Sequence, residues 1–288
     1  MYNLKRFLVG RNVLILIIGL IIVLTVVFFC WNHKLNQSFK VTEYSISTEK
    51  DVGDFRIVMV SDLHLKEYGE NNSELLTKIA ELNPDLIAVV GDLVIYDVNN
   101  YDYAITFLNQ AAKIAPKYFS PCNHEWTLIH HYKCYEFLDA LRDCDAIYLD
   151  NKIETLTING KEIVICGAYD EVEATFGTTD DVFEQLNSNL YDNMFKLVLS
   201  HCPMTISNTK ITPNADLVLS AHEHGGQIIV PFINKSLYSR NQGLFPKYTK
   251  GLHTIVNNQV IISTGLSNSY HKIPRINNQP ELVVINVK

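Results

Sequence analysis

The 288-residue sequence predicts an α/β domain with mixed sheets, preceded by one N-terminal transmembrane helix. Two observations support this prediction. A long uncharged apolar run lies near the N-terminus, and from Phe55 onward short β-branched runs alternate with helical spacing before further strands follow one another directly. The chain is 47% hydrophobic and 19% charged, a composition typical of a folded protein and not of a disordered one.

The apolar run, Val13–Trp31, carries no charged residue. As a helix it would rise about 28 Å, enough to cross the hydrocarbon core of a bilayer. The main alternative is a cleavable signal peptide, whose apolar region is usually shorter, about 7 to 15 residues, and ends in small residues. Here the run ends in Phe28-Phe29-Cys30-Trp31, which is too bulky for cleavage. We therefore expect an uncleaved single-pass anchor in the cell membrane, with the lipid bilayer as a partner.

The charges around this run predict its orientation. Lys5, Arg6 and Arg11 precede it, so the positive-inside rule leaves residues 1–12 cytoplasmic and the large domain extracytoplasmic. Residues 13–31 would be the anchor. Residues 32–50 are polar, with no strong hydrophobic period, and are expected to form a stalk. Residues 51–288 would form the catalytic domain.

The rest of the chain is acidic. The formal charge is -7, and because the three basic residues before the run contribute +3, the remainder carries -7 - 3 = -10. A polyphosphate backbone would be repelled by this charge, so nucleic acid is not expected as a partner. The six cysteines form no CxxC pair and are expected to be mostly buried free thiols.

The domain begins with a strand–helix–strand unit. Residues 56–60 and 86–90 are β-branched runs, and residues 73–82 between them place Leu75, Leu76, Ile79 and Leu82 on one helical face. Two further helices are expected at 101–114 and 132–141. Further strands are expected at 118–120, 146–149, 163–166, 196–199, 217–219, 227–230, 260–263 and 282–287. Since several of these strands follow one another without helices, the sheets should be mixed.

Polar side chains directly follow five of these strands. They therefore lie beyond the carboxyl ends of the strands, which is where ligands bind in α/β sheets. They are Asp62 and His64, then Asp92, then Asn123 and His124, then His201, and finally His222 and His224. Each pattern alone is weak, because Asp and Asn are common in turns and His is an ordinary polar residue. Their joint occurrence is hard to ascribe to chance.

The donor types indicate a metal centre. Two Asp, one Asn and four His suit Mn, Fe or Zn better than Ca or Mg, which prefer shells made only of oxygen. Their number fits two divalent ions that share a carboxylate. Such pairs recur in phosphoester hydrolysis, where they activate a water molecule and stabilise the charge of the transition state.

The sequence resembles the calcineurin-like metallophosphoesterases, especially their membrane-associated bacterial YkuE-like branch. The residues that carry the resemblance are SDLH (61–64), GD (91–92), NHE (123–125), HCP (201–203) and HEHGGQ (222–227). The resemblance implies a four-layer α/β/β/α sandwich. It also implies that Asp62, His64 and His224 bind one metal, that Asn123, His201 and His222 bind the other, and that Asp92 bridges them. His124 would contact the phosphate and could protonate the leaving oxygen.

Two positions depart from the family pattern, which usually has glycine at the positions of Cys122 and Ala221. Glycine permits a left-handed backbone or a close approach, so either loop could be reshaped. Cys122 would lie beside the metals. Arg275 is a further candidate for substrate binding, because a guanidinium matches a phosphate bidentately, although a surface arginine explains it equally well.

The expected function is hydrolysis of a phosphoester at the membrane surface by a metal-bridging hydroxide. A phosphodiester or pyrophosphate of a lipid-linked or envelope substrate is favoured, because tethering raises the local concentration of such a substrate. The alternatives are a phosphomonoesterase or nucleotide phosphatase, and a non-catalytic membrane adaptor with structural metals.

Overall fold

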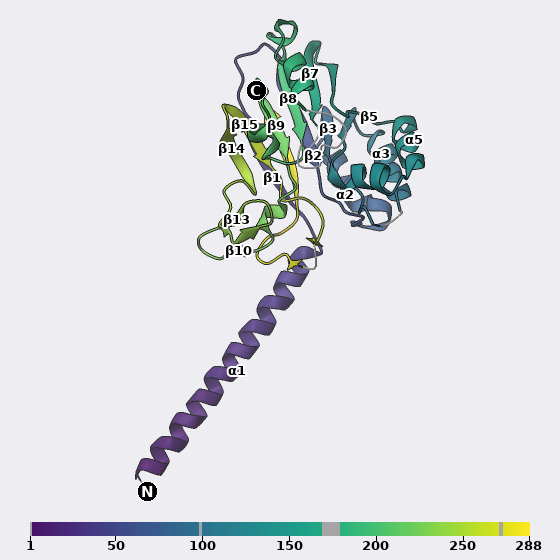
Figure 1. Ribbon diagram of the computed structural model, residues 1–288. Helices are drawn as coiled ribbons and strands as arrows, with labels where there is room; N and C mark the ends of the chain where they lie inside the picture. Colours follow the sequence, from purple (N-terminus) through teal and green to yellow (C-terminus); the bar gives the residue numbers. More distant parts are fainter. Residues whose placement is uncertain (1, 98–99, 169–178, 271–272) are drawn as a thin grey trace.

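The computed structural model describes residues 2–97, 100–168, 179–270 and 273–288 (Figure 1). Its centre is a pair of six-stranded sheets. The first sheet has the order β1 (Lys40–Ile46), β18 (Glu281–Val287), β2 (Phe55–Val60), β3 (Leu86–Val90), β4 (Lys117–Ser120) and β5 (Ile147–Tyr148). The second has the order β14 (Gly251–Ile255), β15 (Asn258–Ile262), β9 (Leu217–Ser220), β8 (Phe195–Ser200), β7 (Lys161–Ala168) and β6 (Lys152–Ile158).

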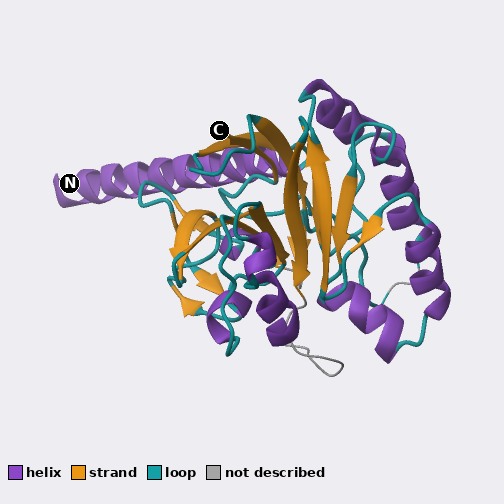
Figure 2. Cartoon of the chain, turned by 90° about the horizontal axis from the view of Figure 1, so that it is seen from above, coloured by secondary structure: helices purple, strands orange, loops and turns teal. Residues whose placement is uncertain are grey.

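Helices cover the outer faces of both sheets, so the domain is a four-layer α/β/β/α sandwich (Figure 2). On the first sheet lie α2 (Ser73–Glu81), α3 (Asp102–Ala111) and α5 (Tyr135–Asp143), while α6 (Thr179–Leu186) and α7 (Thr205–Asn208) lie on the second. The short helix α4 (Asn123–Trp126) follows β4 and runs into η2 (Thr127–His131). Other short helical turns in the described part of the chain are η1 (Glu70–Asn72), η4 (Asn189–Tyr191) and η5 (His224–Gly226).

The central core lies between the two sheets. Alternate residues of each strand point into it, because successive side chains of a strand face opposite ways. In β2, for example, Ile57 and Met59 face the other sheet, whereas Val58 and Val60 pack under the helices. Since β3 is buried on both faces, its sequence is apolar throughout, and such a run was recognisable as a strand.

Three small hairpins lie outside the main sheets. They are β10 (Ile229–Val230) with β11 (Lys235–Ser236), β12 (Tyr238–Ser239) with β13 (Gly243–Leu244), and β16 (Ser269–Tyr270) with β17 (Ile273–Pro274). The strand expected at residues 227–230 is therefore reduced to β10 and does not join a main sheet. The structure also adds β1, β6 and β14, for which no strand was expected.

Helix α1 (Tyr2–Asn36) runs away from the domain. Among the described residues, it is the one helix long and apolar enough to cross a membrane, over Arg11–Asn36. Within the stalk expected at residues 32–50, residues 32–36 continue the helix, and residues 40–46 form β1, which pairs with β18 in parallel and so belongs to the first sheet. β1 could not be recognised from the sequence, because only Ile46 of that strand is buried.

The end of α1 lies at the same edge of the first sheet as the carboxyl ends of its central strands. β1 is parallel to β18, with Lys40 opposite Glu281, and β18 is antiparallel to β2, with Val283 opposite Met59. The start of β1 therefore lies at the same edge of the sheet as the end of β2, with β18 between the two strands. Two buried side chains fasten the helix there, since the amides of Asn32 and Asn36 donate to the carbonyl oxygen of Arg275 at 2.7 and 2.9 Å.

Candidate metal centre

The expected side chains converge because parallel strands of both sheets end at one edge. β2, β3 and β4 are parallel to one another, and so are β8 and β9. Asp62 and His64 follow β2, Asp92 follows β3, Asn123 and His124 follow β4, His201 follows β8, and His222 and His224 follow β9. Strands from two sheets thus deliver side chains to a single site between their ends.

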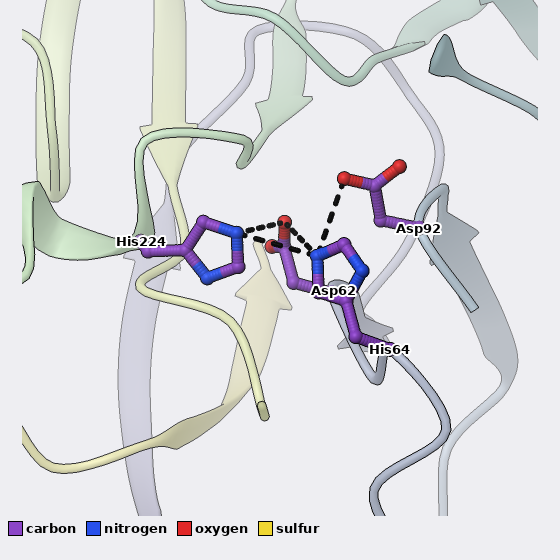
Figure 3. A group of neighbouring side chains, drawn as sticks. All are labelled: Asp62, His64, Asp92 and His224. Carbon is purple, nitrogen blue, oxygen red and sulfur yellow. Dashed lines mark hydrogen bonds and ion pairs between the residues drawn. The ribbon is translucent and has the colours of Figure 1, made fainter. Parts of the chain in front are cut away.

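The first group joins Asp62, His64, Asp92 and His224, one ligand atom from each lying within 4.8 Å of the others. Figure 3 shows these four side chains pointing toward one another. Nε2 of His64 lies 3.4 Å from Oδ2 of Asp92 and 3.3 Å from Nε2 of His224. Nε2 of His224 in turn lies 3.4 Å from Oδ1 of Asp62. All four residues are buried.

The second group joins Asp92, His201 and His222 under the same limit of 4.8 Å. Nε2 of His201 lies 3.1 Å from Oδ2 of Asp92, the oxygen that also faces His64. Asn123 begins α4, and its buried Oδ1 has no hydrogen-bond partner in the structure. Asp92 belongs to both groups and is therefore placed between them.

Backbone carbonyls set the orientation of two of these imidazoles. Nδ1 of His64 lies 3.2 Å from the carbonyl oxygen of Val94, and Nδ1 of His201 lies 2.8 Å from that of Val90. A carbonyl only accepts, so Nδ1 carries a proton in both rings. In the neutral form of each ring the lone pair therefore lies on Nε2, the nitrogen that faces the carboxylates.

The chain reaches this geometry through an unusual backbone. Asp62, His64, Asp92, His222 and His224 all have positive φ, between 44° and 69°. Residues other than glycine seldom adopt this region, and such conformations concentrate at functional sites because the surrounding structure must hold them in place.

Two glycines make room for these turns. A Cβ on Gly91 would lie 2.3 Å from Sγ of Cys122, and a Cβ on Gly265 would lie 2.6 Å from both Cβ and Oδ2 of Asp62. Both glycines also have positive φ. The structure thus explains how the chain accommodates Cys122 where the family usually has glycine: the thiol occupies the space that Gly91 leaves.

The charges of the site influence one another strongly. Burial raises the pKa of Asp62 to about 7 and lowers that of His64 to about 3. Burial also acts against ionisation of Asp92, but His124, His201 and His64 hold its pKa well below the usual range. For His201, burial acts to lower the pKa, but the carboxylates of Asp92 and Asp62 raise it to about 10.

Glu125 supports the site, a role that the sequence did not reveal. Its carboxylate accepts the backbone N–H groups of Leu93 and Val94 on Oε1, and those of Asp92 and Cys122 on Oε2. The Sγ of Cys122 also donates to Oε2, at 3.1 Å, and to Oδ1 of Asp92, at 2.7 Å. Its position in the NHE sequence was the available signal. Its partners Asp92, Leu93 and Val94, however, belong to a loop about 30 residues earlier.

His124 lies beside the first group, with its ring centroid 4.6 Å from that of His64. The backbone N–H of Tyr96 donates to its Nδ1 at 3.2 Å. In the neutral ring this contact leaves the proton on Nε2. His124 is thus arranged to donate a hydrogen bond from Nε2.

Arg275 is fully buried, which differs from the open side chain expected of a substrate-binding arginine. Its guanidinium donates to the carbonyl oxygens of Ser267, Thr264 and Gly265. Its Nη2 also lies 3.4 Å from Nδ1 of His224. These contacts hold the loop after β15 beside His224, and they do not support direct contact between Arg275 and a substrate.

The donor set fits a pair of divalent cations. Both carboxylate oxygens of Asp62 are buried and receive no hydrogen bond, and Nδ1 of His222 also lacks a partner. Buried carboxylates without donors are costly unless a cation compensates them. Imidazole and carboxylate together are the ligands of borderline transition metals.

A family model described as Calcineurin-like phosphoesterase matches residues 55–226. The Bacillus subtilis metallophosphoesterase YkuE is 27% identical over 241 residues, which cover 81% of this chain and 79% of that protein. Phosphodiesterase YaeI of Escherichia coli is 24% identical over 251 residues, covering 86% and 87%. A zebrafish (Danio rerio) protein named as a transmembrane protein with metallophosphoesterase domain is 27% identical over 267 residues, covering 88% and 58%.

The chain spans only 39% to 59% of the length of several curated relatives, including the zebrafish protein. Among solved structures, the NAD nucleotidase of Haemophilus influenzae superposes with a TM-score of 0.50 at 15% identity, covering 75% of this chain and 46% of that one. This likeness concerns the fold alone. The family model covers more than half of the chain, and the matched residues include the metal-ligand types gathered at the sheet edge. The chain therefore belongs to the calcineurin-like phosphoesterases, a family of metal-dependent phosphoester hydrolases.

Proposed function

We propose that this protein is a membrane-anchored phosphodiesterase with two metal ions, acting on a phosphodiester or pyrophosphate of a lipid-linked or envelope substrate. The observation that carries the proposal is the buried carboxylate of Asp92, which two separate ligand groups share. A shared carboxylate is the arrangement that a pair of closely spaced ions needs. The name of the relative YaeI, a phosphodiesterase, favours the diester class.

In this proposal Asp62, His64 and His224 hold one ion, and Asn123, His201 and His222 hold the other, with Asp92 between them. Mn, Fe or Zn suit these donors. Bound divalent ions would supply Lewis-acid stabilisation of phosphate oxygens and an activated water.

The chain's own residues complete the chemistry. Oε1 and Oε2 of Glu125 hold the loop that carries Asp92, which places the shared carboxylate before any substrate arrives. Nε2 of His124 is the proposed hydrogen-bond donor to a phosphate or leaving-group oxygen. Such preorganised donors lower the barrier because they need not reorient as charge develops.

The placement of the site supports a substrate at the membrane surface. α1 meets the domain at the edge where the ligand groups gather, and Nζ of Lys66, two residues after His64, lies 3.4 Å from the carbonyl oxygen of Asn36 in α1. If α1 spans a bilayer over residues 13–31, the site would lie close above the headgroups. We further propose that the domain is extracytoplasmic, as the basic N-terminus indicates. Protease accessibility of the domain in intact cells tests this orientation.

The substrate class is tested with the full chain in detergent or liposomes, supplied with Mn, Fe or Zn. Bis(p-nitrophenyl) phosphate should be hydrolysed faster than p-nitrophenyl phosphate. A panel of lipid pyrophosphates and nucleotide diesters then narrows the class. Turnover of the monoester alone would contradict the diester assignment and favour a phosphomonoesterase.

The site is tested by Asp92→Asn and His124→Ala, with Asp102→Asn, at an exposed position of α3, as the control. Asp92→Asn should lose both activity and bound metal, whereas His124→Ala should lose activity and keep its metal, measured by elemental mass spectrometry. Unchanged activity in both variants would remove the catalytic assignment and favour a non-catalytic adaptor with structural metals.

A further inference from the structure

We propose that the hairpins after the metal ligands form a second membrane contact, which docks the domain on the bilayer beside α1. The contact surface, called the hairpin patch, consists of Phe232, Ile233, Tyr238, Leu244 and Phe245. The inference rests on the proposal that α1 lies in a bilayer. It goes beyond that proposal, because a single anchoring helix would leave the domain free to tilt relative to the membrane.

The hairpin patch exposes large apolar side chains. The exposed fractions are 108% for Phe232 and 71% for Leu244, and 59% each for Ile233 and Phe245. Large apolar side chains exposed on two successive hairpins indicate an interaction site, because their exposure to water is unfavourable. Phe232 and Phe245 also have positive φ, at 67° and 51°, so the turns hold bulky residues in a rare conformation.

The charge around the patch matches an anionic membrane. From Gly225 to Pro280 the sequence has no Asp or Glu, although the chain as a whole has a net charge of -7. The basic residues near the hairpins in this stretch are Lys235, Arg240, Lys247 and Lys250. Basic side chains that flank exposed aromatic and aliphatic residues are typical of surfaces that lie in the headgroup region.

Two hydrogen bonds connect the segment that carries the patch to the end of α1 nearest the domain. The N–H of Ile229 in β10 donates to the carbonyl oxygen of Ile276 at 3.0 Å, and the N–H of Asn277 donates to Oδ1 of Asn32 at 2.9 Å. Asn32 directly follows the apolar run of α1. Phe232 is three residues beyond Ile229, a reach of about 10 Å. Figure 1 shows β10 and β13 on the side of the domain from which α1 leaves.

The patch is also joined to the ligand loop. Glu223 lies between His222 and His224, and its carboxylate accepts hydrogen bonds from Ser239 in β12 and from Asn241. Docking of the hairpins would therefore fix the height and tilt of the ligand groups above the bilayer. Phosphoesters at headgroup level would meet the site in one orientation.

The test places a single tryptophan in the full chain and measures how strongly brominated lipid chains quench its fluorescence. The chain has two tryptophans, Trp31 in α1 and Trp126. With both replaced by Phe, Leu244→Trp reports on the patch. Leu190→Trp is the matched control, since Leu190 is 70% exposed, against 71% for Leu244, and precedes β8 at the opposite end from the metal ligands. The proteins are reconstituted in vesicles of phosphatidylcholine and phosphatidylglycerol with or without brominated acyl chains.

Tryptophan at 244 should lose most of its emission in brominated vesicles, and tryptophan at 190 should lose none. Equal loss at both positions, or no loss at either, overturns the docking. A third protein, Trp126→Phe, retains Trp31 alone and reports on the anchor. Quenching of Trp31 without quenching at 244 refutes the patch and leaves the anchor standing, whereas no quenching of Trp31 refutes both. Hydrolysis of a soluble diester by the same proteins reports separately on the proposed activity.

Discussion

Replacing Glu125 by Gln tests whether the loop that carries Asp92 depends on one buried carboxylate. The two side chains have nearly the same shape, so packing is preserved. Glutamine, however, keeps a single acceptor oxygen and presents an NH₂ group where the second oxygen was. Two of the backbone N–H groups that Glu125 now binds would then face a donor.

The expected loss of unfolding free energy follows from the hydrogen bonds of Glu125. Oε1 accepts from Leu93 and Val94 at 2.8 and 3.3 Å, and Oε2 accepts from Asp92 and Cys122 at 3.1 Å each. A hydrogen bond to a charged group contributes about 1.5–3 kcal/mol, so losing two costs about 3–6 kcal/mol of unfolding free energy. For a domain of this size we expect Tm to fall by about 6 °C or more.

The assay is thermal unfolding of the full chain in detergent, followed by elemental analysis of bound metal. Glu74→Gln is the control, because Glu74 is exposed on α2 and has the same chemistry. We expect Glu125→Gln to lower both Tm and metal content, since Asp92 loses its fixed position. A variant with the Tm and metal content of the control would refute the view that Glu125 builds the site.

Three other perturbations test other parts of the structure. Gly265→Ala should lower both Tm and metal content, because its Cβ would collide with the carboxylate of Asp62. Gly53→Ala is the control: Gly53 also has positive φ but has open space around it, so the change should cost only the backbone strain of about 1–2 kcal/mol. Equal effects of the two substitutions would contradict this prediction. Chelation of the metals should lower the unfolding free energy by about 2.7 kcal/mol for an ion present at 100 times its dissociation constant, and an unchanged Tm after verified metal removal would contradict a role for the ions in folding. Asn32→Ala removes two hydrogen bonds between α1 and the domain, at a cost of about 1–3 kcal/mol, and should speed hydrogen exchange at the start of β1; unchanged exchange there would show that the junction does not depend on them.

The parts that the sequence could predict are those with a local signal. The strand of residues 86–90 is an unbroken apolar run that ends at Gly91-Asp92, so both the strand and the polar residue at its end were recognisable. The same holds for Asp62 after residues 56–60. Their convergence follows from the parallel order of the strands, which the structure confirms. The division of the ligands between two ions stays a prediction.

The parts that the sequence could not predict depend on distant contacts. β1 alternates exposed and half-buried residues, and it is a strand because it pairs with β18, some 240 residues later. Burial of Arg275 was equally hidden, because its partners, the carbonyls of residues 264–267, are defined by the path of the loop after β15. An isolated arginine gives no local sign of whether it is buried.

The pairing of β1 with β18 has a mechanical consequence. A pull on α1 enters the domain at Lys40 and is directed along a seven-residue parallel ladder, with further bonds from Lys40 to Pro280 and from Lys288 to Ile46. Load along the strand axis is shared by all the rungs of the ladder at once, whereas a perpendicular load would open them one by one. Tension applied to α1 should therefore reach the first sheet as shear along β1, without separating the edge strand one hydrogen bond at a time.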